Sequence, residues 1–396
     1  MQEPSGSIDA RAVDLSLLGR PKVDLATMQT ARPRIEWMDL VKGSTVLIVV
    51  LFHSVNQMES ITKEDNVSAV WFTSMNVLEP MRMPLFFMVS GMLAAGAIAR
   101  PWRMSRRRTY GMTYLYLLWS AIFFTVVAFY VNTGWVAAIT QFPGRLLVGS
   151  SGYWYLYALL LYFIVAKLLR RYPAWIIVAL AVGLNLLRPS VAQWNRDFMI
   201  DIDGGSMMTS IVTNLVFFLI GAYYKELLTQ ITRWASWLWV AALLVPVVAY
   251  GIWRSANPST WEQTYFPISL IWIVAGVMAA YLLVQWEAPR RFGVFFGART
   301  LPIFVVQFPL LMCLSSYLHN NDPEFMHNPI VQLLFPIVMT SLLVAAALLL
   351  YWVTRNNVGR YLFEAPAWAV REQSARKRMA LEQGSSNPRD LSQSSR

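Results

Sequence analysis

Long apolar runs separated by short polar stretches make up most of this chain. A helix that crosses a bilayer needs about 20 mainly apolar residues, and these runs have that length. The short alternating segments that indicate membrane β-strands are not the pattern seen here. The runs predict an all-α polytopic membrane protein of about ten helices, at about residues 37–57, 78–99, 109–131, 152–169, 173–187, 209–228, 234–253, 266–286, 301–318 and 330–353.

The first of these runs also carries ionisable residues, which are expensive inside a membrane span and therefore point to function. It contains Asp39, Lys42 and His53 within RIEWMDLVKGSTVLIVVLFHSVNQ. At 100° per residue these three side chains fall on one face roughly 60–80° wide, with Val46 and Val50 between them. Asp39 and His53 lie about 21 Å apart along the axis. We call this face the polar stripe and predict that it lines a polar cavity.

Composition supports the membrane assignment and gives the orientation. The 396 residues are 56% hydrophobic and only 14% charged, whereas soluble domains carry nearer a quarter charged residues. A formal charge of +11 would also suit a nucleic-acid or acidic-membrane partner. However, most basic residues fall in alternate loops and both terminal segments, which predicts topology, with both termini in the cytoplasm and no nucleic-acid partner.

Three regions follow from this pattern. Residues 1–36 form a predicted disordered cytoplasmic arm, residues 37–355 the membrane domain, and residues 356–396 a basic, largely disordered cytoplasmic tail. The single cysteine, Cys313, rules out an intrachain disulfide and a cysteine-based metal site, and we predict no metal.

Candidate chemistry lies at the predicted outer end of the first span. His53 is near that end, and the second span begins close to Glu79 and Arg82, so the three side chains are predicted to share one mouth. A neutral imidazole there can take a proton from an alcohol. The competing interpretation is an interfacial histidine bonded to water or to a neighbouring helix.

At the predicted cytoplasmic end, Asp39 and Lys42 with Arg34 are candidates for the inner entrance of the cavity. A self-neutralising pair within the helix is an equal alternative for Asp39 and Lys42. The cluster RPWRMSRRR is dense enough to hold the phosphates of an anionic cofactor, or it binds lipid headgroups and sets topology.

Two further segments are candidates for substrate binding. Trp154 and Tyr155 begin an aromatic stretch that is typical of a membrane interface and also suits sugar or acyl stacking. Ser90 and Gly91 in the second span favour close helix packing, with a substrate role for Ser90 as the alternative.

Taken in order, these segments resemble the acyltransferase family 3 proteins, membrane enzymes that acylate hydroxyl groups of extracytoplasmic glycans and glycolipids. The resemblance covers roughly residues 34–355. It rests on the segments WMDLVKGSTVLIVVLFH, MPLFFMVSGML, the arginine-rich loop, YWYLYALLLYF, NLVFFLIGAYYKE and GARTLPIFVVQFPLL.

The resemblance implies an O-acetyltransferase of the bacterial plasma membrane, with acetyl-CoA or another acyl-CoA as the cytoplasmic donor. It implies that His53 is the catalytic base, that Lys42, Asp39 and Arg34 match the family's charged positions, and that Arg103, Arg106 and Arg107 hold the donor's phosphates. Implied partners are an extracytoplasmic glycan or glycolipid acceptor and membrane lipid. Within the family the chain looks most like the actinobacterial branch that acetylates trehalose monomycolate.

One position departs from the family pattern. Gln307 stands where many relatives carry a histidine, which puts a relay through a second histidine in doubt. A second function class uses the same charges: a ten-helix secondary transporter or lipid flippase, with Asp39, Lys42, His53 and Arg82 as its pathway. The sequence shows no paired, Gly/Pro-broken segments in matching halves, which disfavours the transporter.

Overall fold

The computed structural model describes residues 35–62, 66–130, 135–149, 151–198, 205–255, 257, 261–321 and 324–366. The regular structure of these ranges is helical: α2 (Glu36–Thr62), α3 (Asn66–Ala99), α4 (Trp102–Tyr130), α5 (Trp135–Leu147), α6 (Trp154–Leu169), α7 (Ala174–Leu186), α8 (Arg188–Phe198), α9 (Gly205–Tyr223), α10 (Lys225–Ile231), α11 (Trp237–Ser255), α12 (Trp261–Leu283), α13 (Glu287–Gly297), α14 (Thr300–Asn321) and α15 (Pro329–Thr354). Short 3₁₀ turns are η2 (Thr232–Trp234), η4 (Glu324–His327) and η5 (Val358–Leu362).

The helices confirm the predicted class, a polytopic all-α membrane protein. Within the described ranges, seven helices are long and apolar enough to cross a membrane, or up to nine if each of two bent pairs is one span. The bent pairs are α7 with α8 and α9 with α10, and α6 is a shorter apolar helix. Each predicted run overlaps a helix, although the run 209–228 crosses the bend between α9 and α10. The number ten and the cytoplasmic termini stay predictions.

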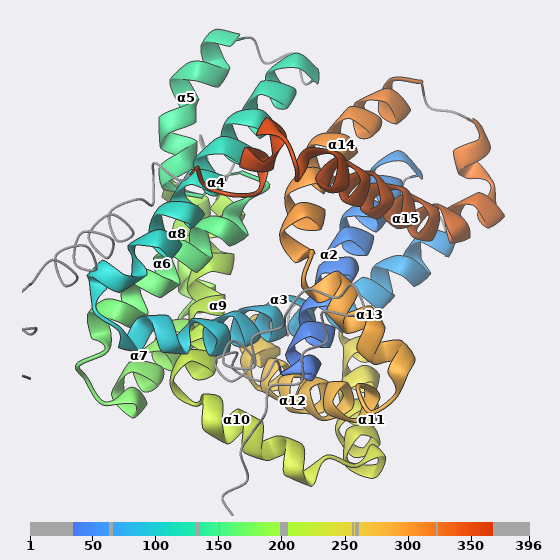
Figure 1. Cartoon of the computed structure of the whole chain (residues 1–396). Helices are drawn as coiled ribbons and strands as arrows, with labels where there is room; N and C mark the ends of the chain where they lie inside the picture. The colour runs from blue at the N-terminus through green and yellow to red at the C-terminus, as the bar shows by residue number, and fades with distance from the viewer. Residues whose placement is uncertain are drawn as a thin grey trace, which may run out of the picture. The chain divides into compact units, whose positions relative to one another are not determined.

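The helices α2 and α3 lie at the centre of residues 36–396. In the most apolar stretch of each helix, 61% of the residues of α2 and 67% of those of α3 are buried, against 22% for α11 and 28% for α15. The neighbours of α2 are α3, α12, α13, α14 and α15 (Figure 1). The helix with the polar stripe is therefore enclosed by protein.

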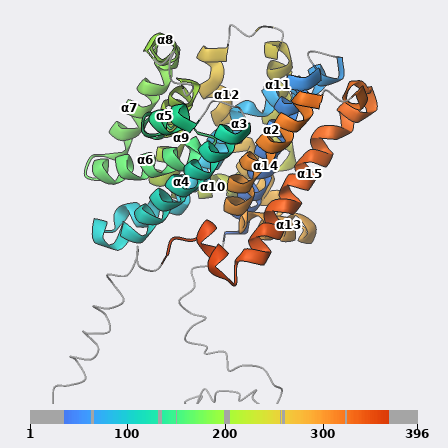
Figure 2. The same cartoon turned by 90° about the horizontal axis from the view of Figure 1, so that it is seen from above.

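The ends of the helices fall into two groups. Figure 2 shows the starts of α2 and α4 near α13 and η5, at one end of the assembly. At the opposite end lie α8, the end of α11 and the start of α12. The first end is the one that the charge pattern predicts to be cytoplasmic.

A close crossing of α3 and α9 depends on two glycines. A Cβ added to Gly91 would overlap the carbonyl oxygen of Phe218, and one added to Gly221 would overlap that of Met88. Because backbone cannot yield as a flexible side chain does, only glycine fits at these two positions. This agrees with the close helix approach that the Ser90–Gly91 pair predicts.

We expect Gly221→Ala to lower stability. Overpacking costs about 1–3 kcal/mol, which outweighs the gain of about 1 kcal/mol that alanine brings to a helix. Thermal unfolding of the detergent-purified protein measures the effect. Gly183→Ala is the matched control, since nothing lies within 4 Å of its added Cβ. Equal melting temperatures for the two variants would contradict the proposed packing.

Two stretches between the predicted spans are helical and not loops. Residues 58–77 are mostly helix, because α2 runs to Thr62 and α3 begins at Asn66 and passes through Pro80 and Pro84. The early turns of α3 are largely apolar, and Trp71 Nε1 donates to Leu333 O of α15 (3.2 Å). The stretch 188–208 contains α8, a polar helix that follows α7 directly.

Residues 356–366, which the sequence assigns to the start of the tail, include η5. The backbone of η5 accepts hydrogen bonds from α4, from Tyr114 Oη to Tyr361 O (3.0 Å) and from Trp119 Nε1 to Leu362 O (2.7 Å). Phe363 is buried against Trp119. Two hydrogen bonds and the aromatic contacts of Phe363 with Trp119 and Tyr351 therefore join this segment to α4 and α15. The remaining tail, residues 367–396, and arm residues 1–34 lie outside the described residues.

Candidate functional site

The charged pair of the polar stripe lies at the start of α2. Lys42 Nζ is 3.0 Å from Asp39 Oδ1, and Asp39 is buried. The short helix α13 packs on this turn through glycines, since a Cβ on Gly297 would overlap Asp39 and one on Gly293 would overlap Leu40. The geometry is that of an intrahelical ion pair held in place by α13.

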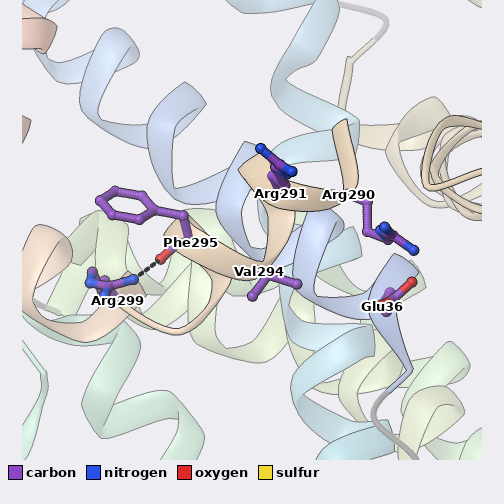
Figure 3. A pocket seen from close by; sticks show the side chains of 6 residues that line it. All are labelled: Glu36, Arg290, Arg291, Val294, Phe295 and Arg299. Carbon is purple, nitrogen blue, oxygen red and sulfur yellow. Dashed lines mark hydrogen bonds between the residues drawn. The ribbon is translucent and has the colours of Figure 1, made fainter. Parts of the chain in front are cut away.

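A pocket of about 650 Å³ opens beside this packing contact. Figure 3 shows Arg290 near Glu36 on one side and Arg299 on the other, with Val294 between them. Arg291 and Phe295 complete the lining. The pocket thus presents three guanidinium groups, one carboxylate and an apolar surface.

The middle of the polar stripe faces the protein interior. Val46 and Val50 are essentially inaccessible to solvent. Thr340 Oγ1 donates to Ser54 Oγ (3.2 Å), and this bond ties α15 to α2 one residue after His53. The orientation is as predicted, whereas a continuous polar cavity along the stripe stays a prediction.

His53 and Arg82 come together at the far end of α2 through aromatic rings. The His53 ring lies 4.7 Å from that of Phe308 and 5.1 Å from that of Phe52. Arg82 Cζ lies 3.6 Å from the centroid of the Phe52 ring, close enough for its charge to act on His53. Arg82 is buried, and its Nη1 has no hydrogen-bond partner among the described residues.

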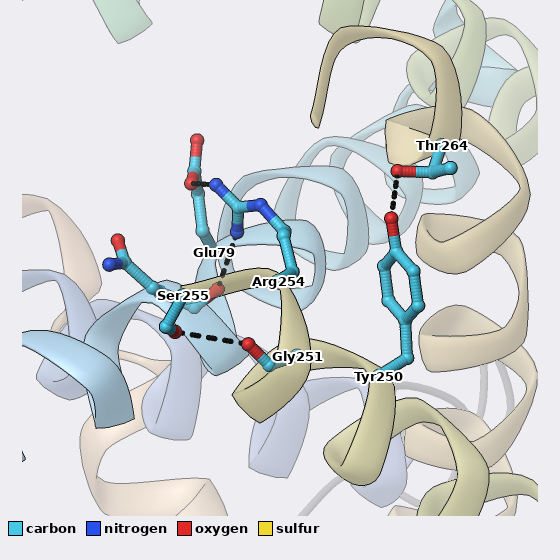
Figure 4. Close-up of polar contacts among 7 residues, drawn as sticks. Glu79, Tyr250, Gly251, Arg254, Ser255 and Thr264 are labelled. Atoms are coloured by element: carbon cyan, nitrogen blue, oxygen red, sulfur yellow. Dashed lines mark hydrogen bonds and ion pairs between the residues drawn. The ribbon is translucent and has the colours of Figure 1, made fainter. Parts of the chain in front are cut away.

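Glu79 has a partner that sequence analysis did not select. Its Oε2 is 3.4 Å from Arg254 Nη2 of α11, as Figure 4 shows. Arg254 Nη1 also donates to Asn76 O (3.2 Å). Glu79 also acts electrostatically on Arg82. Glu79 is thus a counter-charge behind Arg82 and pairs directly with Arg254.

Gln307 is buried close to the same place. It is 1% exposed and directly precedes Phe308, which contacts His53. Neither its Nε2 nor its Oε1 has a hydrogen-bond partner in the described part of the chain. An amide is costly to bury without partners, so this position suits a polar ligand or water.

Ser90 and Tyr155 contact each other inside the protein. Their hydroxyl oxygens are 3.0 Å apart, and Ser90 also donates to Phe86 O (2.8 Å). Tyr155 is buried, and Trp154 is half-buried with its ring 5.9 Å from that of Phe87. Tyr155 is therefore an interior residue and does not belong to an interfacial belt.

The arginine-rich turn between α3 and α4 has an outer and an inner face. Arg103, Arg106 and Arg107 are exposed on the first turns of α4. Arg108 instead turns inward, where it donates to Leu93 O (3.3 Å) and acts electrostatically on Tyr155. Buried Lys167 holds the turn itself by donating to Ala97 O, Arg100 O and Ser105 Oγ.

The remaining predicted site residue, Arg34, lies outside the described residues. Sequence analysis missed Arg254, Arg108 as an inward residue, and the arginines beside α13. Arg254 and the arginines at α13 had been counted as markers of topology, and Arg108 only as one member of the RPWRMSRRR cluster. The Gly293–Gly297 spacing, typical of close helix packing, could have drawn attention to α13. Among the described residues, no three His, Cys, Asp or Glu side chains are grouped to hold a metal.

Comparison with known proteins gives one family and two relatives. An acyltransferase domain model matches residues 35–355. The inner membrane protein YcfT of Escherichia coli K12 is 25% identical over 370 residues, which cover 84% of this chain and 96% of that protein. The nodulation protein NolL of Sinorhizobium fredii is 32% identical over 157 residues, or 38% of this chain and 41% of that protein. No solved structure matches significantly.

Proposed function

Because the chain belongs to the acyltransferase family whose domain model spans residues 35–355, we propose that it is a membrane O-acyltransferase. It moves an acetyl or other acyl group from acyl-CoA to a hydroxyl of an extracytoplasmic sugar or glycolipid. The observation that carries this proposal is the placement of His53 beside buried Arg82, on the same helix as the Asp39–Lys42 pair.

In the proposed reaction His53 is the general base. The acceptor hydroxyl gives its proton to the imidazole as its oxygen attacks the thioester carbonyl carbon. The carbonyl oxygen becomes negative, and Arg82, with an Nη1 that has no hydrogen-bond partner among the described residues, stabilises it. The carbon–sulfur bond then breaks, and the leaving thiolate takes the proton from His53. No metal or redox partner is needed for these steps to balance.

The two substrates approach from opposite ends of α2. The donor enters near Asp39 and Lys42 at the predicted cytoplasmic end, and the acceptor reaches His53 from the other side. We place the protein in the bacterial inner membrane, in line with the name of its relative, the inner membrane protein YcfT. Trehalose monomycolate is the first acceptor to test.

The test is transfer of radiolabelled acetyl from acetyl-CoA by the purified protein in vesicles. We expect label in an acceptor from a panel of envelope glycolipids and glycans, including trehalose monomycolate. The transporter hypothesis is measured in the same vesicles, as proton-driven uptake of the acceptor without any CoA donor. Uptake without acyl transfer to any acceptor would overturn the proposed function.

A further inference from the structure

The pocket beside α13 combines the groups that recognise a nucleotide. Arg290, Arg291 and Arg299 supply guanidinium donors, which suit phosphate oxygens in paired geometry. Phe295 is 43% exposed, and its ring lies 4.2 Å from Arg299 Cζ. An exposed ring beside arginines is the surface on which a base stacks. The pocket volume, about 650 Å³, lies within the range of small-molecule sites.

The net charge of the pocket lining is positive, which favours an anionic ligand, and its single carboxylate allows discrimination between anions. The lining contains three arginines and one carboxylate, that of Glu36. Arg291 pairs with Glu287 of its own helix, and Arg299 Nη1 donates to Phe295 O (2.8 Å). Arg290 is exposed and stands beside Glu36 (Figure 3). Arg290 and Arg299, from opposite sides, therefore contribute most of the field within the pocket.

The pocket is fixed to the helix that carries the proposed base. Gly293 and Gly297 pack directly on Leu40 and Asp39, and Gly43 packs on Phe296. From Glu36 at the pocket to His53, α2 rises about 26 Å. A ligand that joins a nucleotide to a thioester through a long flexible arm is the chemical class that can occupy both ends.

We infer that the pocket formed by Arg290, Arg299 and Phe295 holds the phosphates and base of the acyl donor. This inference rests on the proposed function, and it replaces Arg103, Arg106 and Arg107 as the main phosphate site. Those three arginines are exposed on α4 and do not line this pocket. α13, not the α3–α4 turn, then sets where the donor enters.

The experiment measures the affinity of coenzyme A for the full chain purified in neutral detergent. For Arg290→Gln with Arg299→Gln we expect the Kd to rise at least about tenfold, since charge-assisted hydrogen bonds to phosphate are lost. Exposed Arg290→Gln alone should give at least about a threefold rise. The charge-matched control is Arg171→Gln with Arg233→Gln, two exposed arginines elsewhere, and it should leave the Kd within about twofold.

Further measurements separate the proposed pocket from a phosphate site on α4 and from a lipid headgroup site. Arg103→Gln with Arg107→Gln should weaken coenzyme A binding less than the pocket variant, and a greater loss there would overturn the inference. Unchanged affinity of the Arg290→Gln, Arg299→Gln variant for coenzyme A would also overturn the inference. Acyl transfer at saturating donor tests the proposed function separately, so the proposed function can hold even when the inference fails. Nanodiscs with and without phosphatidylglycerol test the lipid alternative. If the Arg290→Gln, Arg299→Gln variant loses only its binding of phosphatidylglycerol headgroups and keeps its affinity for coenzyme A, the inference fails.

Discussion

Replacement of His53 by alanine should reduce acyl transfer by about 10²–10⁴-fold, the range that a positioned general base contributes. The ring contacts Phe52 and Phe308, and among the described residues it has no hydrogen-bond partner that an alanine would leave unsatisfied. We therefore expect the variant to fold and to bind coenzyme A like the wild type. Initial rates of radiolabelled acetyl transfer, with melting temperature alongside, measure both quantities.

A second histidine provides the control for this prediction. His327 is exposed in the 3₁₀ turn η4 and is not among the residues whose rings contact His53. His327→Ala should transfer acetyl at the wild-type rate. Undiminished transfer by His53→Ala, at a melting temperature near that of the wild type, would remove His53 from the proposed mechanism.

The sequence was a good guide to the centre of the fold and a poor one to its connections. Ionisable residues within an apolar run predicted that one face of α2 turns inward, and Val46 and Val50 on that face are buried. Helix ends were misjudged where a helix continues beyond the predicted span, as in residues 66–77 of α3, because element boundaries are the least reliable part of a pattern-based assignment. The η5 segment, which composition assigned to the tail, packs on α4 through Phe363 and Trp119.

The sequence predicted individual residues of the candidate site, but not which of them contact each other. His53 and Arg82 were selected from their types and depths, and the structure brings them together. Arg254 was counted as an exterior loop charge, yet it pairs with Glu79 across α3 and α11. Such partners depend on which helices are neighbours, and no spacing within one chain segment reports that. Arg290 and Arg299 escaped notice for the same reason.

Replacement of Arg82 by glutamine should lower kcat by about 10²–10³-fold while the KM for the donor changes little. That is the loss seen when one donor to a developing oxyanion is removed. Arg82 has an unpartnered Nη1 in the described part of the chain and contacts the Phe52 ring, so the substitution breaks no described hydrogen bond of that atom. Glu79 keeps its counter-charge in Arg254, which limits the cost to folding.

Arg145→Gln is the matched control for Arg82→Gln. Arg145 also lies over a phenylalanine ring, with Cζ 5.8 Å from the Phe124 centroid, but it belongs to α5 and not to the site. It should keep the wild-type kcat. If Arg82→Gln instead raised the KM for the donor at constant kcat, Arg82 would bind ground-state substrate and would not stabilise the oxyanion. A large fall in melting temperature without any kinetic change would make Arg82 a purely structural residue.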